Sequence, residues 1–504
     1  MKFTGWMMDI ARDQSPREDW LHATLSRSAA AGYGAVGLYL EHRYAYPSAP
    51  WAAGPGAVTP AVARGLVEKH RNLRVIPFLN TLGHMEGFIR AEGGQWLAET
   101  TNFWSLQTCP SRTECADFAR GLVADALKVF DDEWVHIGGD EAWELGNCPK
   151  CSERAKEIGK AGVYGVYFGE LCRWVLAQGR RPCIWGDMLL NHPEAMQHIP
   201  RETILFDWQY FTRPLESSRK FRDAGFDVVC CPSVQTYNSA WCFWDATRRN
   251  IDEHAEDAAA LGALGVLVTS WEFSYFTHYA GVMPLIFAAG RRLARGEAWA
   301  AAVEAESDAS YAALATLVGE RIPTCGEMIK AGTWRLIRDR LIIRQNPFEL
   351  WRTWRSEACG PAGDAILAAC SEADAILAAS APNSTARELA LPIALYRLAV
   401  RWVRGVEAAR EHYAAGRLAP AADGIAGLLH LFEDLRPELT RIADAGGSRA
   451  DLSRLDRLKE KAEAVVRRLG NLPGGSYRPS FETLVHDNYI AGDQAAWRTG
   501  PLSA

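Results

Sequence analysis

Two adjacent carboxylates, Asp140 and Glu141, follow a short apolar segment that ends in two glycines. Successive side chains on a regular strand point to opposite faces, so both acids can reach one site only where the strand ends or bends. Gly138 and Gly139 permit such a bend, because glycine adopts backbone conformations that other residues avoid. Two neighbouring carboxylates in different environments have different pKa values, so one is ionised while the other keeps a proton to donate. This division of roles suits the cleavage of a glycosidic bond.

Further polar and aromatic side chains follow other apolar segments in the first half of the chain. A sugar ring offers hydroxyl groups, which bind to Arg or carboxylate side chains, and apolar faces, which stack on indole rings. His136 precedes the two glycines inside its own apolar segment, so we expect a buried structural role for it. The candidates for a shared site with the acid pair are Arg12, His84, Trp185, Asp187, Trp208, Tyr237, Trp271 and Glu272.

Eight short apolar segments must position these residues, and most of the intervals between them contain a stretch of helix-like character. This alternation favours an α/β fold, a (β/α)8 TIM barrel, over a doubly wound sheet. In a TIM barrel the active site lies at the C-terminal ends of the strands, which is where the candidate residues fall. The predicted strands are Phe3 to Met8, Ala35 to Leu40, Val75 to Leu79, Trp134 to Ile137, Cys183 to Trp185, Ile204 to Phe206, Val228 to Cys231 and Val266 to Trp271.

The second half of the chain has a different pattern. After Gly290, long segments rich in Ala, Leu, Arg and Glu indicate amphipathic helices, divided by clusters of turn residues. We therefore predict a catalytic (β/α)8 barrel over residues 1–295 and an all-α C-terminal domain over residues 296–504. The helical part contains no comparable group of catalytic residues, so we expect it to act as a scaffold or to form a homodimer.

Length and charge restrict the possible partners. A chain of 504 residues exceeds what one hydrophobic core usually organises, which agrees with two domains. The net charge of -6 gives no electrostatic reason to expect nucleic acid or an anionic membrane as a partner. Residues 1–10 contain no apolar run long enough for a signal peptide, so we expect a cytoplasmic protein.

Twelve cysteines are dispersed along the chain, and free thiols are a better expectation than a disulfide framework. Cys148 and Cys151 form one close pair. Together with Cys109 and Cys115 they could form a structural zinc site, although the latter two are separated by five residues rather than two. Buried or surface thiols are the favoured interpretation, and the zinc site stays open.

Residues 136–141, His-Ile-Gly-Gly-Asp-Glu, resemble the signature of glycoside hydrolase family 20, the β-N-acetylhexosaminidases. The similarity extends over residues 1–295 as separate matches at the strand ends. These matches are Asp9 to Arg12, Gly83 and His84, Trp185 to Asp187, Trp208, Tyr237 and Trp271. The resemblance implies a glycoside hydrolase with a TIM barrel. Because the first strand begins almost at Met1, the chain looks like a compact branch without the small α/β domain that commonly precedes this barrel.

The resemblance also implies a mechanism without a metal or cofactor. In this family the substrate's own 2-acetamido carbonyl oxygen attacks C1 and forms an oxazolinium intermediate. Glu141 would be the general acid and base, and Asp140 would orient the acetamido group and stabilise its charge. Tyr237 would donate to the carbonyl oxygen. The tryptophans that would enclose the acetamido methyl group are Trp185, Trp208 and Trp271.

Some details depart from the family pattern and leave alternatives open. Glu272 directly follows Trp271, whereas many members have one residue between them. Asn238 and Ser239 stand where an acidic ligand of sugar hydroxyls often occurs, so the choice between terminal β-linked GlcNAc and GalNAc stays open.

Two other functions compete with the exo-acting hexosaminidase. A metal-dependent hydrolase could use His84, His136, Asp140 and Glu141 as ligands. An inactive glycan-binding relative would keep the tryptophans but lose the acid, and the intact carboxylate pair argues against it.

Overall fold

The structure is a computed structural model of the whole chain. It describes residues 3–11, 16–101, 105–236, 240–271, 276, 278–322, 337, 340–341, 344–445, 449–472 and 478–486. The chain divides into two compact units. The first comprises residues 1–235, 245–273 and 282–307, and the second comprises residues 236–244, 274–281 and 308–504.

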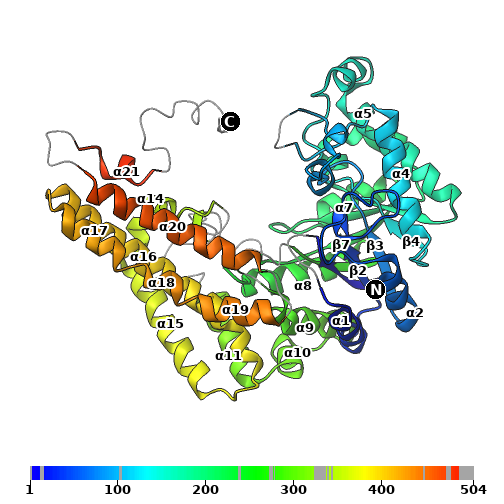
Figure 1. The fold of residues 1–504 in the computed structure, drawn as a ribbon. Helices are drawn as coiled ribbons and strands as arrows, with labels where there is room; N and C mark the ends of the chain where they lie inside the picture. Colours follow the sequence, from blue (N-terminus) through cyan, green and yellow to red (C-terminus); the bar gives the residue numbers. More distant parts are fainter. Residues whose placement is uncertain are drawn as a thin grey trace. The chain divides into compact units, whose positions relative to one another are not determined.

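Eight parallel strands close into a barrel in the first unit (Figure 1). Neighbouring strands pair in sequence order, and the last of them, β9, pairs with β1 in parallel. A two-residue strand, β8 (Ser233–Val234), adds a short pairing to β9. All eight predicted strands are confirmed, as β1 (Phe3–Asp9), β2 (Ala35–Tyr39), β3 (Arg74–Phe78), β4 (Trp134–His136), β5 (Arg181–Trp185), β6 (Ile204–Trp208), β7 (Asp227–Cys231) and β9 (Gly265–Ser270).

Large apolar side chains from the strands fill the core of this unit. Because both faces of a barrel strand are covered, the strand sequences are almost continuously apolar rather than alternating. The side chains of Met7, Tyr39, Phe78, Trp185 and Phe206 belong to one buried cluster. This packed core fixes the strand ends, from which the candidate residues extend.

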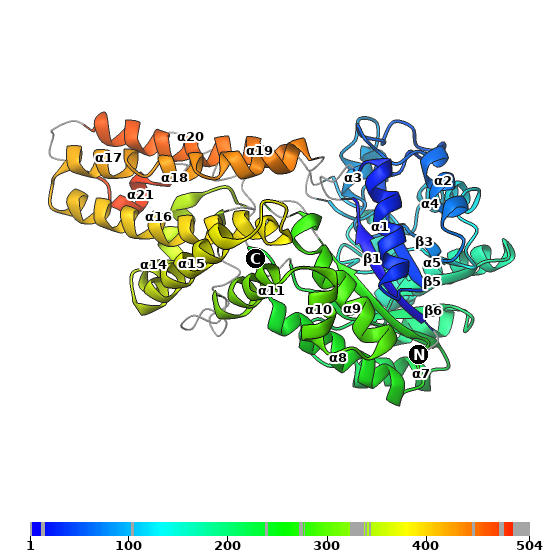
Figure 2. The same ribbon diagram turned by 90° about the horizontal axis from the view of Figure 1, so that it is seen from below.

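Helices lie between successive strands of the barrel, as the alternating pattern predicted (Figure 2). Thr59 caps one of them, because its hydroxyl accepts a hydrogen bond from the Val62 backbone N–H. The helices of this unit are α1 (Glu18–Ala30), η1 (Glu41–Arg43), α2 (Pro60–Lys69), α3 (Glu86–Ile89), η2 (Gln95–Leu97), α4 (Thr113–Leu127), α5 (Pro149–Ala177), α6 (Asp187–Asn191), η3 (Pro193–His198), α7 (Leu215–Asp223), α8 (Trp244–Ala260), α9 (Met283–Arg295) and α10 (Trp299–Glu306).

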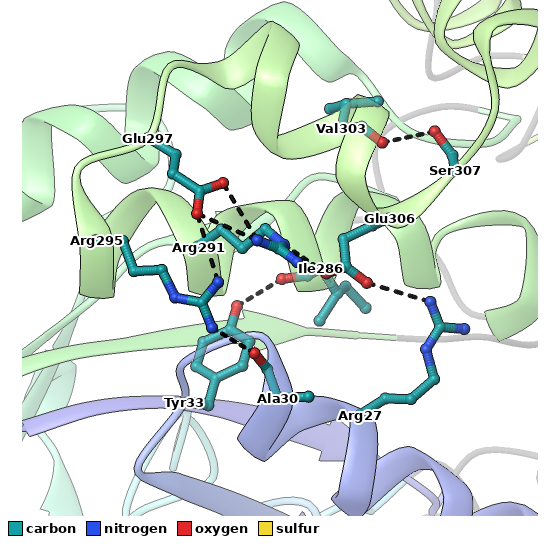
Figure 3. Close-up of polar contacts among 10 residues, drawn as sticks. All are labelled: Arg27, Ala30, Tyr33, Ile286, Arg291, Arg295, Glu297, Val303, Glu306 and Ser307. Carbon is teal, nitrogen blue, oxygen red and sulfur yellow. Dashed lines mark hydrogen bonds and ion pairs between the residues drawn. The ribbon is translucent and has the colours of Figure 1, made fainter.

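Polar contacts join the start and the end of the barrel unit (Figure 3). The Arg27 guanidinium in α1 lies 3.2 Å from a carboxylate oxygen of Glu306 in α10. Arg291 in α9 binds the other oxygen of Glu306 at 2.6 Å. Tyr33 donates a hydrogen bond to the Ile286 carbonyl at 2.7 Å. Helix α10 therefore packs with the barrel, so the predicted boundary between residues 295 and 296 lies inside the first unit.

The second unit is helical in its described part. Its long helix α16 packs against α14, α15 and α17, and α17 packs against α20. Trp402 of α16 is fully buried and donates to the Pro347 carbonyl at 2.7 Å. The elements are η4 (Tyr279–Gly281), α11 (Ala309–Thr316), η5 (Leu317–Arg321), α14 (Pro347–Ala358), α15 (Pro361–Ala379), η7 (Thr385–Leu389), α16 (Ala390–Ala414), α17 (Leu418–Ala426), α18 (His430–Glu433), α19 (Arg436–Asp444), α20 (Ala450–Gly470) and α21 (Phe481–Leu484).

A membrane span needs about 20 mainly apolar residues in one helix. None of the described helices is both long enough and apolar enough to meet this requirement.

Candidate active site

The chain turns sharply where β4 ends. Gly138 and Gly139 have φ angles of 80° and 109°, in the region that residues with side chains avoid. A Cβ atom on Gly139 would lie only 2.9 Å from the Tyr164 hydroxyl. Glu141 has a φ of 47°, which is uncommon for a residue other than glycine. The bend predicted from the two glycines is confirmed, and it brings Asp140 and Glu141 out of the strand direction.

His84 links the two acids. Its Nε2 atom lies 3.4 Å from Asp140 Oδ2 and 3.2 Å from Glu141 Oε2. His84 also has a positive φ, of 53°. A Cβ atom on Gly83 would lie 2.5 Å from the Asp140 carbonyl oxygen, so the absence of a side chain lets the two loops approach. The structure therefore brings three of the predicted site residues together.

Asp140 is a buried carboxylate with one oxygen left for a ligand. Burial raises the pKa of Asp140, but the charge of His84 and its hydrogen bond outweigh burial and hold this pKa below its usual value. The Oδ1 atom is buried and has no hydrogen-bond partner among the described residues. An unpaired buried carboxylate oxygen is costly, so a donor from a bound molecule would stabilise it.

Asp187 binds the backbone of the loop that carries Glu141. Its Oδ2 atom accepts a hydrogen bond from the Glu141 backbone N–H at 3.0 Å, and its Oδ1 atom accepts from Trp208 Nε1 at 3.3 Å. Burial, together with the nearby charge of Asp140, raises the pKa of Asp187 to about 7. Asp187 thus fixes the positions of Glu141 and Trp208.

Three tryptophans and two tyrosines lie at the same strand ends. Trp271 Nε1 donates to the Tyr210 hydroxyl at 2.7 Å, and the Trp208 ring lies 5.1 Å from the Tyr210 ring. The Trp185 and Tyr39 rings lie 6.0 Å and 4.9 Å from the Trp271 ring. Trp185 is fully buried, whereas Trp208 and Trp271 are partly buried. In this structure Trp185 therefore supports Trp271 from the core, and the other two indoles are partly exposed.

Tyr210 and Tyr39 were not predicted from the sequence. Tyr210 follows Trp208 by two residues, and residues at that spacing on an extended chain share a face. This spacing was the signal that could have identified it. Tyr39 is the last residue of β2, and its hydroxyl accepts a hydrogen bond from Asn80 Nδ2 at 2.5 Å.

His136 is buried inside the barrel, as predicted. Its ring is fully buried and stacks on Phe78 at 4.5 Å. Burial lowers the pKa of His136 to about 3, so the imidazole is neutral. Among the described residues, His84, His136, Asp140 and Glu141 do not form a group whose ligand atoms converge. This geometry gives the metal-dependent alternative no support.

Three of the predicted site residues lie outside the described residues. They are Arg12, Tyr237 and Glu272. Asn238 and Ser239, on which the distinction between GlcNAc and GalNAc depends, lie outside them as well.

One family model matches part of the chain. Residues 53–281 match the model described as "Glycosyl hydrolase family 20, catalytic domain". Beta-hexosaminidase 1 of Coccidioides posadasii is 24% identical over 196 residues, which cover 34% of this chain and 32% of that protein. Beta-hexosaminidase of Akkermansia muciniphila is 27% identical over 138 residues, or 26% of each chain. The chain thus spans about a third, or less, of the length of these curated relatives.

Solved structures with a similar fold include two hexosaminidases. The β-N-acetylhexosaminidase of Bacteroides fragilis has a TM-score of 0.48 and 16% identity, covering 58% of this chain and 65% of that one. A family 20 exo-β-N-acetylglucosaminidase of Vibrio harveyi, solved with N-acetylglucosamine, has a TM-score of 0.47 and 16% identity, covering 58% of this chain and 54% of that one.

Proposed function

We propose that the protein is an exo-acting, retaining β-N-acetylhexosaminidase, because residues 53–281 match the model of the glycosyl hydrolase family 20 catalytic domain. Its substrates are glycans with terminal β-linked GlcNAc or GalNAc. The observation that carries this proposal is that two acids with different exposure both contact His84. Asp140 is buried and its Oδ1 atom has no hydrogen-bond partner among the described residues, whereas the Glu141 side chain is partly exposed.

Asp140 binds the substrate's acetamido group in this proposal. An amide N–H is a donor of the kind that the unpaired Oδ1 atom needs, and an ionised carboxylate stabilises positive charge that develops on the amide nitrogen. With the nitrogen held, the acetamido carbonyl oxygen attacks C1 and displaces the leaving oxygen. The pKa of Asp140, held low by His84, favours the ionised form that this step requires.

Glu141 transfers the proton. Its side chain is 41% exposed, so it can reach a glycosidic oxygen that enters from solvent, and later a water molecule. It first protonates the leaving oxygen and then removes a proton from the water that opens the oxazolinium ring. Asp187 holds the Glu141 backbone, which keeps the acid in the same place for both steps.

The remaining predicted residues complete the substrate site in this proposal. Trp208 and Trp271 contact the acetamido methyl group and the sugar ring, while buried Trp185 supports Trp271. Tyr237 donates to the carbonyl oxygen, and Arg12 and Glu272 bind sugar hydroxyls. The resemblance to the family supports these last three roles.

Turnover of paired aryl β-GlcNAc and β-GalNAc glycosides tests the proposed activity. We expect hydrolysis of at least one of the two, with the β-anomer of the free sugar as the first product. Absence of turnover of both substrates by folded protein would contradict the proposal. The ratio of the two kcat/KM values determines which sugar is preferred.

A further inference from the structure

Three cysteines and one glutamate from the segments after β3 and β4 converge on one another. Cys109 Sγ lies 3.6 Å from Cys148 Sγ and 3.4 Å from Cys151 Sγ. Cys151 Sγ lies 3.4 Å from Glu99 Oε2. The four ligand atoms all lie within 4.8 Å of one another. Glu99, Cys109 and Cys151 are almost completely buried, and Cys148 is partly buried.

These separations match the edges of a tetrahedral metal site. With Zn–S bonds of about 2.3 Å, two thiolates in tetrahedral geometry lie about 3.8 Å apart. With a Zn–O bond of about 2.0 Å, a thiolate and a carboxylate oxygen lie about 3.5 Å apart. The distances between Cys109 and the other two sulfurs, and between Cys151 and Glu99, are therefore already close to what one bound ion requires. Three sulfur ligands favour Zn²⁺ over Mg²⁺ or Ca²⁺, which prefer oxygen.

The surrounding backbone holds the four side chains in place. Cys148 is the N-cap residue of α5, and its Sγ accepts a hydrogen bond from the Cys151 backbone N–H at 3.3 Å. The Cys148 backbone N–H in turn donates to Glu99 Oε1 at 3.0 Å, which turns Oε2 toward the sulfurs. Three thiolates and one carboxylate carry more negative charge than one Zn²⁺ ion neutralises. The N-terminus of α5 would stabilise the remaining negative charge.

Glu99 replaces the fourth ligand that the sequence suggested. Cys115 does not join the group, because its Sγ lies 3.7 Å from the Leu97 carbonyl oxygen instead. Glu99 was missed because it lies ten residues before Cys109, outside the close spacings that are typical of zinc ligands in sequence. A short antiparallel bridge between Ala98 and Thr108 places Glu99 beside Cys109.

The group connects the two loops that carry the catalytic residues. Glu99 and Cys109 belong to the loop after β3, which also contains His84. Cys148 and Cys151 follow the loop after β4, which contains Asp140 and Glu141. We propose that Glu99, Cys109, Cys148 and Cys151 bind a structural Zn²⁺ that holds these two loops together. The ion takes no part in the sugar chemistry, so this proposal does not depend on the proposed activity.

Metal analysis of the full-length protein, produced in zinc-supplemented medium, tests the proposal. We expect about one zinc per chain after extensive dialysis. Replacement by Co²⁺ should give thiolate-to-cobalt charge-transfer absorption in the near ultraviolet, together with the visible bands of tetrahedral cobalt. A protein that contains less than about 0.1 zinc per chain, and that shows no such absorption after addition of Co²⁺, would overturn the proposal.

Matched variants locate the ion. Cys151→Ser should lose most of the zinc, and Glu99→Gln should weaken its retention against a chelator by ~10-fold or more. Cys115→Ser is the control, because it removes a buried thiol nearby and should keep about one zinc per chain. Equal zinc contents in all three variants would overturn the proposed ligand set.

A further measurement covers the case in which Cys151→Ser fails to fold. In that case a mercurial reagent that blocks thiols should release the zinc from the protein without substitutions. The amount of zinc released should rise in proportion to the modification of Cys109, Cys148 and Cys151. A disulfide within the group, detected by mass spectrometry of protein purified under argon, would contradict the zinc site.

Discussion

Asp140 and Glu141 are neighbours in sequence, but their surroundings differ. The Asp140 side chain is 10% exposed and the Glu141 side chain is 41% exposed, while both lie within 3.4 Å of His84 Nε2. Different exposure gives two carboxyl groups different tasks, since the buried one is fixed by its partners and the exposed one can reach solvent. This difference in exposure supports the proposed roles of Asp140 in charge stabilisation and of Glu141 in proton transfer.

Glu141→Gln tests the second of these roles. The amide cannot donate a proton to the leaving oxygen, so kcat/KM for a substrate with a poor sugar leaving group should fall by ~10²-fold or more. The loss should be smaller for an activated aryl leaving group, which needs little protonation. Steady-state kinetics on both substrates measure the difference. Equal losses on the two substrates, or no loss on either, would refute the role.

Asp187→Asn tests the electrostatics around the acid pair. The pKa of Asp187 is raised from an ordinary 3.8 to about 7 by burial and by the charge of Asp140. Between these pH values the folded protein keeps a proton that the unfolded chain has lost, so this group makes the free energy of unfolding fall as pH rises from about 4 to about 7. The variant has no such proton, and its stability should decrease less between pH 5 and pH 8.

Urea unfolding at both pH values measures this difference. Asp223→Asn, at an exposed position at the end of α7, is the control and should keep the pH dependence of the unmodified protein. Identical pH dependence in Asp187→Asn would show that Asp187 is ionised throughout this range.

The contact between the loop after β3 and the loop after β4 places His84 within reach of Asp140 and Glu141. Gly83→Ala would place a Cβ atom 2.5 Å from the Asp140 carbonyl oxygen, so one of the two loops must move. A shift of this kind should lower kcat/KM by ~10-fold to 10²-fold, because catalysis depends on the placement of reacting groups.

Gly65→Ala is the matched control. Gly65 lies in α2, where no described atom is within 4 Å of the added Cβ. It should leave kcat/KM unchanged and raise the free energy of unfolding by ~0.5 to 1 kcal/mol, because alanine favours a helix. If Gly83→Ala keeps full kcat/KM, the close approach of these loops is not required for catalysis.

The elements were easier to predict from the sequence than the contacts between their loops. Strand positions follow from short apolar runs, and the bend at β4 follows from Gly138 and Gly139, so both signals are local. The contact of Tyr210 with Trp271 and that of Glu99 with Cys148 and Cys151 were missed, because each joins segments that are far apart in sequence. Local periodicity carries no information about which distant loops meet.

The helical unit bears on whether the protein associates in solution. Its apolar stripes predicted a scaffold or a homodimer. Its described helices bury these stripes against one another, and no large hydrophobic side chain among the described residues of this unit is exposed. We therefore expect light scattering to give the monomer mass of 55.7 kDa over a range of protein concentrations. Twice that mass would support the homodimer that the sequence predicted.

In the proposed mechanism, the substrate's acetamido group attacks C1. The most direct measurement compares kcat/KM for two aryl β-glycosides with the same leaving group, one of GlcNAc and one of glucose. We predict efficient turnover of the first and negligible turnover of the second, and Asp140→Asn should lose the first activity although Glu141 is intact. Full activity on the glucoside, together with a 2-fluoro sugar trapped on Asp140 or another carboxylate, would contradict the mechanism.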